Sequence, residues 1–122
     1  MNENKDIAGW MCDQELEILA QWAGKVPLKG NIIEIGSMFG RSTFEFASAA
    51  DPSVNIYCGD RFPDVYFYLH NSRDPVCPKS GKIYNMLEEF RKNTQKFNNI
   101  TIMQGEMPVE STYSGDPIDL FF

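Results

Sequence analysis

The chain has 122 residues, which suffices for one domain with a buried core but not for several domains. Its hydrophobic fraction of 43% and aromatic fraction of 13% exclude a disordered chain. The 11 basic and 17 acidic residues give a net charge of −6. This balance argues against non-specific nucleic-acid binding, because such binding needs clustered Lys and Arg.

The lack of a targeting signal and the pattern of cysteines predict the cellular compartment. The sequence shows neither a signal peptide nor an apolar run long enough to span a membrane. Cys12, Cys58 and Cys77 are odd in number and lack CxxC spacing, which is typical of reduced thiols in the cytosol. We therefore expect a cytoplasmic protein with no nucleic-acid partner and no membrane partner.

The first predicted elements are an N-terminal arm, residues 1–12, and a helix. The arm is polar, and we expect residues 1–9 to fray. Residues 13–23 are predicted to be helical because apolar residues recur there at helical spacing. Asp13 can cap this helix and Gly24 is a natural stop.

A strand, a helix and a second strand follow. Residues 31–35 form an apolar strand, residues 41–50 form a helix that ends before Pro52, and residues 54–58 form the next strand. Such a unit of about 30 residues pairs its strands in parallel through a right-handed crossover. The sequence therefore predicts an α/β fold with a parallel sheet.

The remaining residues continue this alternation. Residues 61–80 are predicted to be a long connection, residues 81–97 an amphipathic helix and residues 100–103 a third strand. A fourth strand is predicted to begin at Ile118 and is still running at Phe122. We therefore expect the sequence to be a piece of a longer domain.

The most specific pattern is residues 31–43, NIIEIGSMFGRST. Glu34 is a carboxylate in a buried strand, so it must be paired or must bind something. Gly36 permits a backbone conformation closed to other residues, and Gly40 lets the next helix aim its free N–H groups at a ligand. Met38 occupies the place where the dinucleotide fingerprint needs glycine, which disfavours a nicotinamide-dependent oxidoreductase. A Glu34 that only ties its own loop together is the alternative.

Asp60 is the second acidic residue of interest. It follows the second strand, where a carboxylate can accept both hydroxyls of a ribose. A solvated turn aspartate is the alternative, and it is weaker beside Glu34 and the two glycines.

Together these residues resemble the class I S-adenosylmethionine-dependent methyltransferases. Residues 34–40 are similar to the first motif of that family, an acidic residue, any residue, glycine, three residues and glycine. Arg41-Ser42-Thr43 is similar to a subgroup whose motif continues Gly-Arg-Ser-Thr, as is Gly9-Trp10 before the first helix. That subgroup includes small-molecule and sugar methyltransferases, some of them metal-dependent. The resemblance runs from about Gly9 to the last residue.

The resemblance implies a fold and a domain layout. The fold would be a Rossmann-like three-layer sandwich, here incomplete, with about four parallel strands in the order 3-2-1-4 and helices on both faces. Residues 13–122 would be the cofactor-binding part of the domain.

The resemblance also implies a binding site for S-adenosylmethionine. Its residues would be Glu34, Gly36, Ser37, Gly40, Asp60, Arg61, Gly105 and Glu106. Glu34, Gly36 and the Ser37 backbone would hold the methionine part of the cofactor.

The adenosine part of the cofactor would lie at the ends of the second and third strands. Asp60 would bind the ribose hydroxyls, and Arg61 or Phe62 would lie beside the adenine. Gly105 and Glu106 match the place that often contacts the adenine amino group, although a surface role for Glu106 is equally open.

The catalytic residues are left unassigned. In the family, a general base and any divalent-metal ligands would lie beyond Phe122, so this chain could bind the cofactor without turnover. Asp119 opens the strand before that loop and is more often structural. No metal ligands are predicted within the sequence itself.

Other candidates are weaker. His70 is the only histidine, so no histidine pair or triad can be built. Its spacing to Asp64 and Asp74 matches no known metal site. Residues 66–68 are aromatic and would either form a lid over an acceptor or pack at the sheet edge.

The favoured function is O-methyl transfer to a small molecule or sugar. The alternative is a non-catalytic nucleotide-binding or assembly module that keeps the fold. We also expect a homo-oligomer, because in the order 3-2-1-4 the fourth strand is an exposed apolar edge that invites pairing with another chain.

Overall fold

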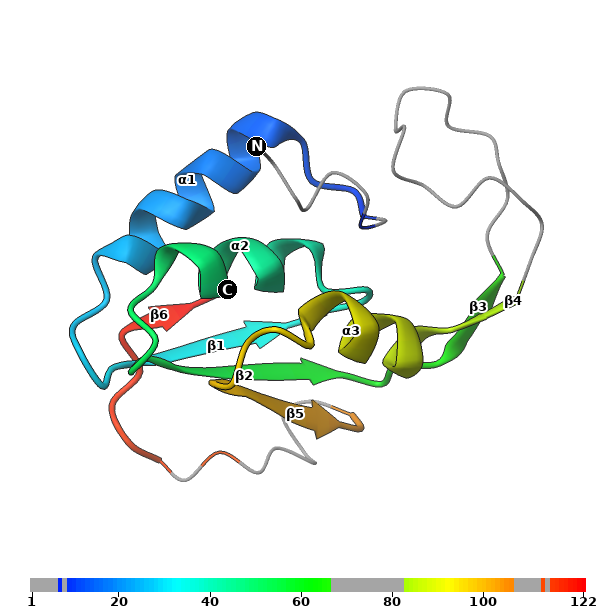
Figure 1. Ribbon diagram of the computed structural model, residues 1–122. Coiled ribbons are helices and arrows are strands. Elements are labelled where there is room, and N and C mark those ends of the chain that lie inside the picture. The colour runs from blue at the N-terminus through cyan, green and yellow to red at the C-terminus, as the bar shows by residue number, and fades with distance from the viewer. Residues whose placement is uncertain (1–6, 8, 67–82, 107–112, 114) are drawn as a thin grey trace.

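A four-stranded parallel sheet with helices along one face organises the computed structural model, which describes residues 7, 9–66, 83–106, 113 and 115–122 (Figure 1). A separate antiparallel pair of short strands extends from one end of it. The elements are α1 (Asp13–Gly24), β1 (Asn31–Ile35), α2 (Arg41–Ala49), β2 (Asn55–Asp60), β3 (Asp64–Tyr66), β4 (Ile83–Asn85), α3 (Met86–Thr94), β5 (Ile100–Gln104) and β6 (Leu120–Phe121).

The order of the strands confirms the predicted fold class. The sheet runs β5-β2-β1-β6 and every pairing in it is parallel, which is the predicted order 3-2-1-4. In the β1–β2 register, Glu34 lies opposite Cys58 and Ile35 opposite Gly59. The carboxyl ends of β1, β2 and β5 therefore meet at one edge of the sheet.

The helices differ from the prediction in their placement. Within the described residues, α1, α2 and α3 all lie over the same face of the sheet, where helices on both faces were expected (Figure 1). For α2 and α3 the reason is the handedness of the crossovers. The steps from β1 to β2 and from β2 to β5 go in the same direction, so right-handed connections put α2 and α3 on one face. The described residues of the return connection to β6 form no helix.

The region before α3 also corrects the prediction. The expected helix over 81–97 is shorter, because Ile83–Asn85 form β4, which pairs with β3 from the expected loop. Asn85 ends the strand and caps the helix, since its Oδ1 accepts the Glu88 N–H at 2.9 Å. The apolar residues of β4 continue the helical spacing of α3, so periodicity alone could not separate the two.

The core lies between the sheet and the three helices. Its largest fully buried side chains include Phe46 on α2, Phe90 on α3, and Ile32 and Ile56 on the two central strands. Within the described part of the chain, no helix has the length and apolar character needed to cross a membrane.

The N-terminal residues are more ordered than predicted. Ile7 is 4% exposed and belongs to the core, and Gly9 is buried, so the fraying expected over residues 1–9 is wrong for both. Cys12, not Asp13, occupies the cap position of α1, and its N–H donates to Glu15 Oε2 at 2.8 Å. The sequence missed this because a cysteine is an uncommon cap.

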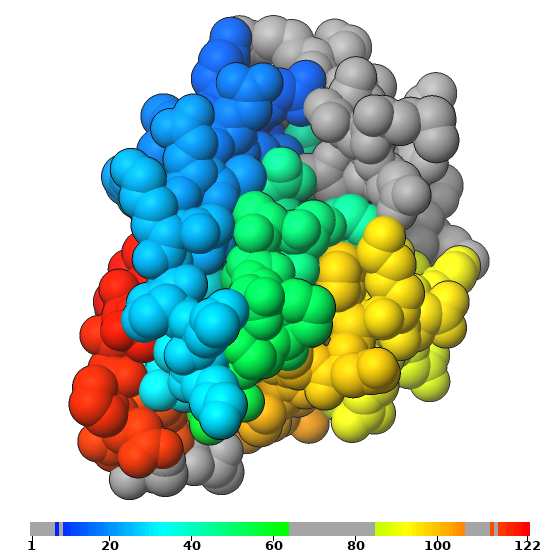
Figure 2. Space-filling view, turned by 60° about the vertical axis from the view of Figure 1, so that its left-hand side comes forward, coloured from blue at the N-terminus to red at the C-terminus, as the bar shows by residue number. Residues whose placement is uncertain are grey.

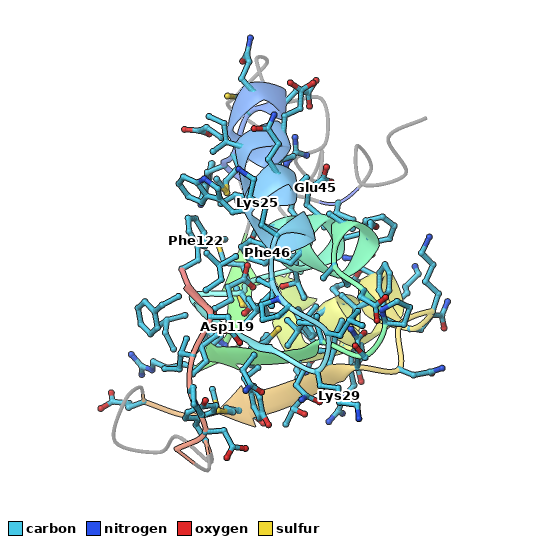
Figure 3. All side chains as sticks on the ribbon, turned by 90° about the vertical axis from the view of Figure 1, so that its left-hand side faces the viewer. Lys25, Lys29, Glu45, Phe46, Asp119 and Phe122 are labelled. Atoms are coloured by element: carbon cyan, nitrogen blue, oxygen red, sulfur yellow. The ribbon has the colours of Figure 1, made fainter. Side chains whose placement is uncertain are left out.

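Strand β6 begins two residues later than the predicted Ile118 and is fixed by a side chain that precedes it. The Asn31 N–H donates to Asp119 Oδ2 at 2.9 Å, so Asp119 has the structural role expected for it. At the other end, the Phe122 N–H donates to Ile33 O at 2.8 Å. The Phe122 ring meets the Phe46 ring at a centroid distance of 5.7 Å (Figure 3).

Candidate functional site: a pocket at the carboxyl ends of the strands

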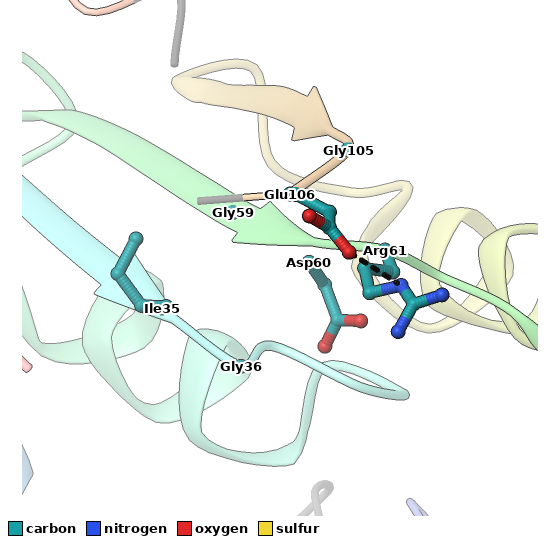
Figure 4. Close-up of a pocket in the computed structure, with 7 residues that line it drawn as sticks. All are labelled: Ile35, Gly36, Gly59, Asp60, Arg61, Gly105 and Glu106. Atoms are coloured by element: carbon teal, nitrogen blue, oxygen red, sulfur yellow. Dashed lines mark ion pairs between the residues drawn. The ribbon is translucent and has the colours of Figure 1, made fainter. Parts of the chain in front are cut away.

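A pocket of about 450 Å³ opens where the three strands end (Figure 4). Its volume falls in the range of roughly 300–1,000 Å³ that is usual for ligand sites. Its lining residues are Ile35, Gly36, Gly59, Asp60, Arg61, Gly105 and Glu106. Five of the predicted site residues, from three separate segments, are thus brought together here, namely Gly36, Asp60, Arg61, Gly105 and Glu106.

Backbone hydrogen bonds hold the glycines of this pocket in place. The Gly36 N–H donates to Gly59 O at 2.7 Å, and the Gly105 N–H donates to Asp60 O at 2.9 Å. Gly36 has φ +86°, a left-handed conformation, and a Cβ there would meet nothing within 4 Å. Gly36 is therefore required for its backbone conformation and not for lack of space.

Gly40 serves a different purpose. It is the residue before α2, with φ +91°, and a Cβ would lie 3.0 Å from Thr94 Cγ2 and 3.1 Å from the Phe90 ring. The close approach lets α3 support the loop after β1, and Asn93 Nδ2 adds a hydrogen bond of 2.9 Å to Phe39 O. Gly40 does not line the pocket. Its role is to let the loop after β1 pack closely against α3.

Asp60 is the polar centre of the pocket. Its Oδ2 accepts the Met38 N–H at 2.9 Å and its Oδ1 accepts the Phe62 N–H at 2.8 Å. Met38 and Phe62 both have left-handed backbone conformations, with φ +50° and +48°. A carboxylate has about four acceptor sites, so two remain for a ligand that presents hydroxyl groups.

Glu34 lies beneath the loop and does not line the pocket. Its side chain is 0% exposed, and both carboxylate oxygens accept hydroxyl hydrogen bonds at 2.5 Å, from Ser42 and from Thr43. Burial raises the pKa of Glu34, and the neighbouring hydroxyls of Ser37, Ser42 and Thr43 oppose that rise. In this structure Glu34 therefore ties β1 to the first turn of α2 through two hydroxyl groups, where the alternative drawn from the sequence was a carboxylate that binds the amides of its own loop.

A second, smaller pocket of about 190 Å³ adjoins the first, because Gly36 lines both. It is lined by Gly9, Trp10, Met11, Gly36, Ser37, Met38, Arg41, Ser42 and Phe122. Ser37 is 2% exposed, and its Oγ makes no hydrogen bond of good geometry, although it lies near enough to Glu34 to act on the pKa of that carboxyl. A buried hydroxyl without a well-formed hydrogen bond is costly, so Ser37 has capacity for a further polar partner.

Arg61 and Glu106 flank the outer side of the larger pocket (Figure 4). Arg61 Nε and Glu106 Oε1 are 4.0 Å apart, and both side chains are 72% exposed. An exposed pair of this kind contributes about 0–1 kcal/mol. The pair therefore lines the pocket but contributes little to the stability of its shape.

Arg41 is a pocket residue whose role the sequence did not reveal. It is 8% exposed and stands at the first position of α2, where the helix dipole disfavours a cation. The position of Arg41 in the sequence could have revealed this role, because a buried basic residue at a helix start needs specific hydrogen-bond partners.

Some predicted candidates lie outside this description. His70, Asp74 and residues 67–68 fall outside the described residues, and of Asp64 and Tyr66 only the backbone of β3 is described. In the part of the chain that is described, no group of three His, Cys, Asp or Glu side chains could hold a metal ion.

Comparisons with known proteins place the fold. No family model matches the sequence, and no curated protein matches it. The structure is similar to that of cofactor-bound Rv0187 from MTB, with a TM-score of 0.67, 19% identity, and coverage of 98% of this chain and 47% of that one.

Two further solved structures give the same result. A protein provisionally assigned as an O-methyltransferase from Klebsiella pneumoniae has a TM-score of 0.64 at 16% identity, over 98% of this chain and 47% of its own. Precorrin-6y C5,15-methyltransferase from Geobacter metallireducens GS-15 has a TM-score of 0.56 at 16% identity, over 88% and 48%. The chain spans about half the length of these structures. The chain therefore has the fold of the class I S-adenosylmethionine-dependent methyltransferases.

Proposed function

We propose that this chain binds S-adenosylmethionine across Gly36 and belongs to a methyltransferase. The observation that carries the proposal is the pair of adjoining pockets on either side of this glycine. The larger pocket offers the free acceptor sites of Asp60, which suit the two hydroxyls of a ribose. The smaller pocket offers the Ser37 hydroxyl, which makes no hydrogen bond of good geometry within the described residues and suits a polar amino-acid group.

The residues divide into those that contact the ligand and those that support them. Asp60, Arg61, Gly105 and Glu106 would hold the adenosine part, and Gly36 and Ser37 the methionine part. Glu34 would act beneath the loop by fixing the helix start that carries Ser42 and Thr43. When bound, the cofactor supplies an electrophilic methyl group, and the residues of this chain orient it.

For the acceptor, we propose a hydroxyl group of a small molecule or sugar. The first-motif resemblance of residues 34–43 and the name of the Klebsiella pneumoniae protein support this choice. A non-catalytic nucleotide-binding or assembly module is the second candidate, and it is supported by the lining of the two pockets, whose groups suit a nucleotide ligand without requiring a reaction.

Ligand binding tests the proposal directly. Thermal denaturation and isothermal titration are measured with S-adenosylhomocysteine, S-adenosylmethionine and NAD. Ligand at 100 times its dissociation constant should add about 2.7 kcal/mol to the free energy of unfolding. Absence of any shift at millimolar S-adenosyl ligand, or tighter binding of NAD, would overturn the proposal. Binding without methyl transfer to any offered acceptor would favour the second candidate.

We also propose that β6 pairs with a second copy of this chain. Phe121 is 65% and Ile35 40% exposed, and their side chains share the sheet face opposite the helices. The C-terminal residues, in red, lie at the surface along one edge of the molecule (Figure 2). An exposed apolar edge of this kind favours strand pairing between chains.

Analytical ultracentrifugation tests this pairing. Phe121→Lys places a charge on the apolar face beside the edge and should convert an oligomer to a monomer. Leu28→Lys changes another exposed apolar side chain, 73% exposed between α1 and β1, and should leave the mass unchanged. A wild-type chain that stays monomeric at high concentration would contradict the proposal.

A further inference from the structure

We infer that Arg41 is a positioning residue that holds the N-terminal segment, residues 7 and 9–12, as a wall of the smaller pocket. Arg41 Nη1 donates to Ile7 O at 3.0 Å, and Arg41 Nε donates to Met11 O at 3.0 Å. One side chain thus bonds to the backbone of this segment at two points. The segment has no sheet partner, so these carbonyl groups depend on a side-chain donor.

The placement of Arg41 supports this role. The guanidinium is largely buried at the start of α2, where both desolvation and the helix dipole act against a cation. The ion pair with Asp13 is long, at 3.9 Å, and Asp13 is 56% exposed, so it offsets little. The two bonds to the N-terminal segment are therefore the main compensation for burying this charge.

The shape of the segment fits the side chain that holds it. A Cβ at Gly9 would lie 2.7 Å from Arg41 Cδ and 3.1 Å from Arg41 Cβ, so only glycine lets the backbone pass this close to Arg41. Ile7 anchors the far end of the segment in the core at 4% exposure. Gly9, Trp10 and Met11, which follow this anchor, line the smaller pocket together with Ser37.

The two pockets consequently differ in whether their walls depend on the N-terminal segment. The smaller pocket has three lining residues from the N-terminal segment, and the larger pocket has none. This inference rests on the proposed function, in which the amino-acid half of the ligand enters the smaller pocket. Loss of Arg41 should then weaken ligands that carry the amino-acid half and spare ligands that lack it.

The test compares S-adenosylhomocysteine with 5′-methylthioadenosine, which keeps the adenosine and lacks the amino-acid group. For Arg41→Met we expect at least a tenfold loss of affinity for S-adenosylhomocysteine by isothermal titration. Affinity for 5′-methylthioadenosine should stay within twofold. Arg91→Met, the same change at an exposed position of α3, should alter neither affinity. An equal loss for both ligands, or no loss, would overturn the inference.

Two further measurements separate the possible failures. Wild-type protein that binds neither ligand would refute the proposed function itself, independently of Arg41. If Arg41→Met does not fold, Gly9→Ala tests the same contact with Arg41 retained, and it should give the same selective loss. Hydrogen exchange of a peptide covering residues 7–12 should accelerate in both variants, and unchanged exchange would contradict the role of Arg41.

Discussion

The Met38 N–H donates a hydrogen bond of 2.9 Å to Asp60 Oδ2, which links the loop after β1 to the end of β2. The second oxygen of the same carboxylate accepts the Phe62 N–H at 2.8 Å. Both donors lie in left-handed conformations, which cost about 1–2 kcal/mol per residue for non-glycine side chains. Asp60 therefore stabilises two strained turns and shapes the pocket before any ligand arrives.

Replacing Asp60 should affect both stability and ligand binding. Asp60→Ala leaves two backbone N–H groups without their acceptor, so we expect a loss of about 2–4 kcal/mol in the free energy of unfolding by urea denaturation. Asp60→Asn keeps one acceptor oxygen and should lose about 1–2 kcal/mol. Affinity for S-adenosylhomocysteine should fall more than about tenfold in both variants, because a charged acceptor for ribose is lost.

Asp51 provides the matched control for Asp60. Its Oδ1 accepts the Ser53 N–H at 2.9 Å in an exposed turn away from the pocket. Asp51→Asn should leave ligand affinity unchanged. An affinity loss as large as that of Asp60→Asn would show that the effect on binding is not local to the pocket.

Glu34 should make stability depend on pH. Because burial raises its pKa above 4.5, the stability that it contributes is fully present below about pH 4.5 and is lost as pH rises through the folded-state value. Glu34→Gln cannot ionise, so the free energy of unfolding of wild type relative to this variant should decrease as pH rises above about 4.5. Urea denaturation from about pH 4.5 to 8 measures the difference.

Glu88→Gln is the control for this pH series. Glu88 is exposed in the first turn of α3, so its replacement measures the effect of removing a carboxylate that is not buried. A Glu34→Gln difference that stays flat across the series would refute the prediction.

Gly30 should be intolerant of any side chain. A Cβ there would lie 2.7 Å from Asp119 Oδ2 and 2.8 Å from Pro27 O, and the second of these atoms is backbone. Gly30→Ala should therefore lower the free energy of unfolding by about 1–3 kcal/mol, as overpacking does. It should also weaken the attachment of β6, which hydrogen exchange at residues 119–122 would detect.

Gly24→Ala is the corresponding control. Its Cβ would have an ordinary contact of 3.7 Å with Ala49 O, and its backbone conformation suits alanine. We expect Gly24→Ala to be neutral or to stabilise by up to about 1 kcal/mol, because alanine reduces the entropy of the unfolded chain. A destabilisation equal to that of Gly30→Ala would show that crowding at Gly30 is not the cause.

The cysteines should differ sharply in reactivity. Cys58 is buried beside Glu34 and Thr43. Burial raises the pKa of its thiol well above 9.0, so little thiolate is present. Cys12 is exposed. Brief alkylation followed by peptide mapping should modify Cys12 in the native protein and Cys58 only after denaturation. Equal labelling of both in the native state would contradict the described packing.

The sequence by itself determined the fold class and five of the seven residues that line the larger pocket. The alternation of apolar strands and amphipathic helices required parallel strands, because each crossover is long enough for a helix. Gly36 was identified because the turn after the first strand needs a residue that adopts a left-handed conformation. Asp60 was identified because a carboxylate directly after the adjacent parallel strand lies at the same edge of the sheet. Such residues are visible in a sequence because local geometry already restricts the residue type.

Only the tertiary structure decided which partners the candidate residues contact. From the sequence, Glu34 could bind a ligand or tie its own loop together, and in the structure its carboxylate instead accepts hydrogen bonds from Ser42 and Thr43 of α2. Arg41 acquired a role through Ile7 and Met11, which are distant along the chain and adjacent only after folding. Local spacing restricts which conformation a residue adopts, whereas the partners of a buried polar side chain depend on which segments the fold brings against it.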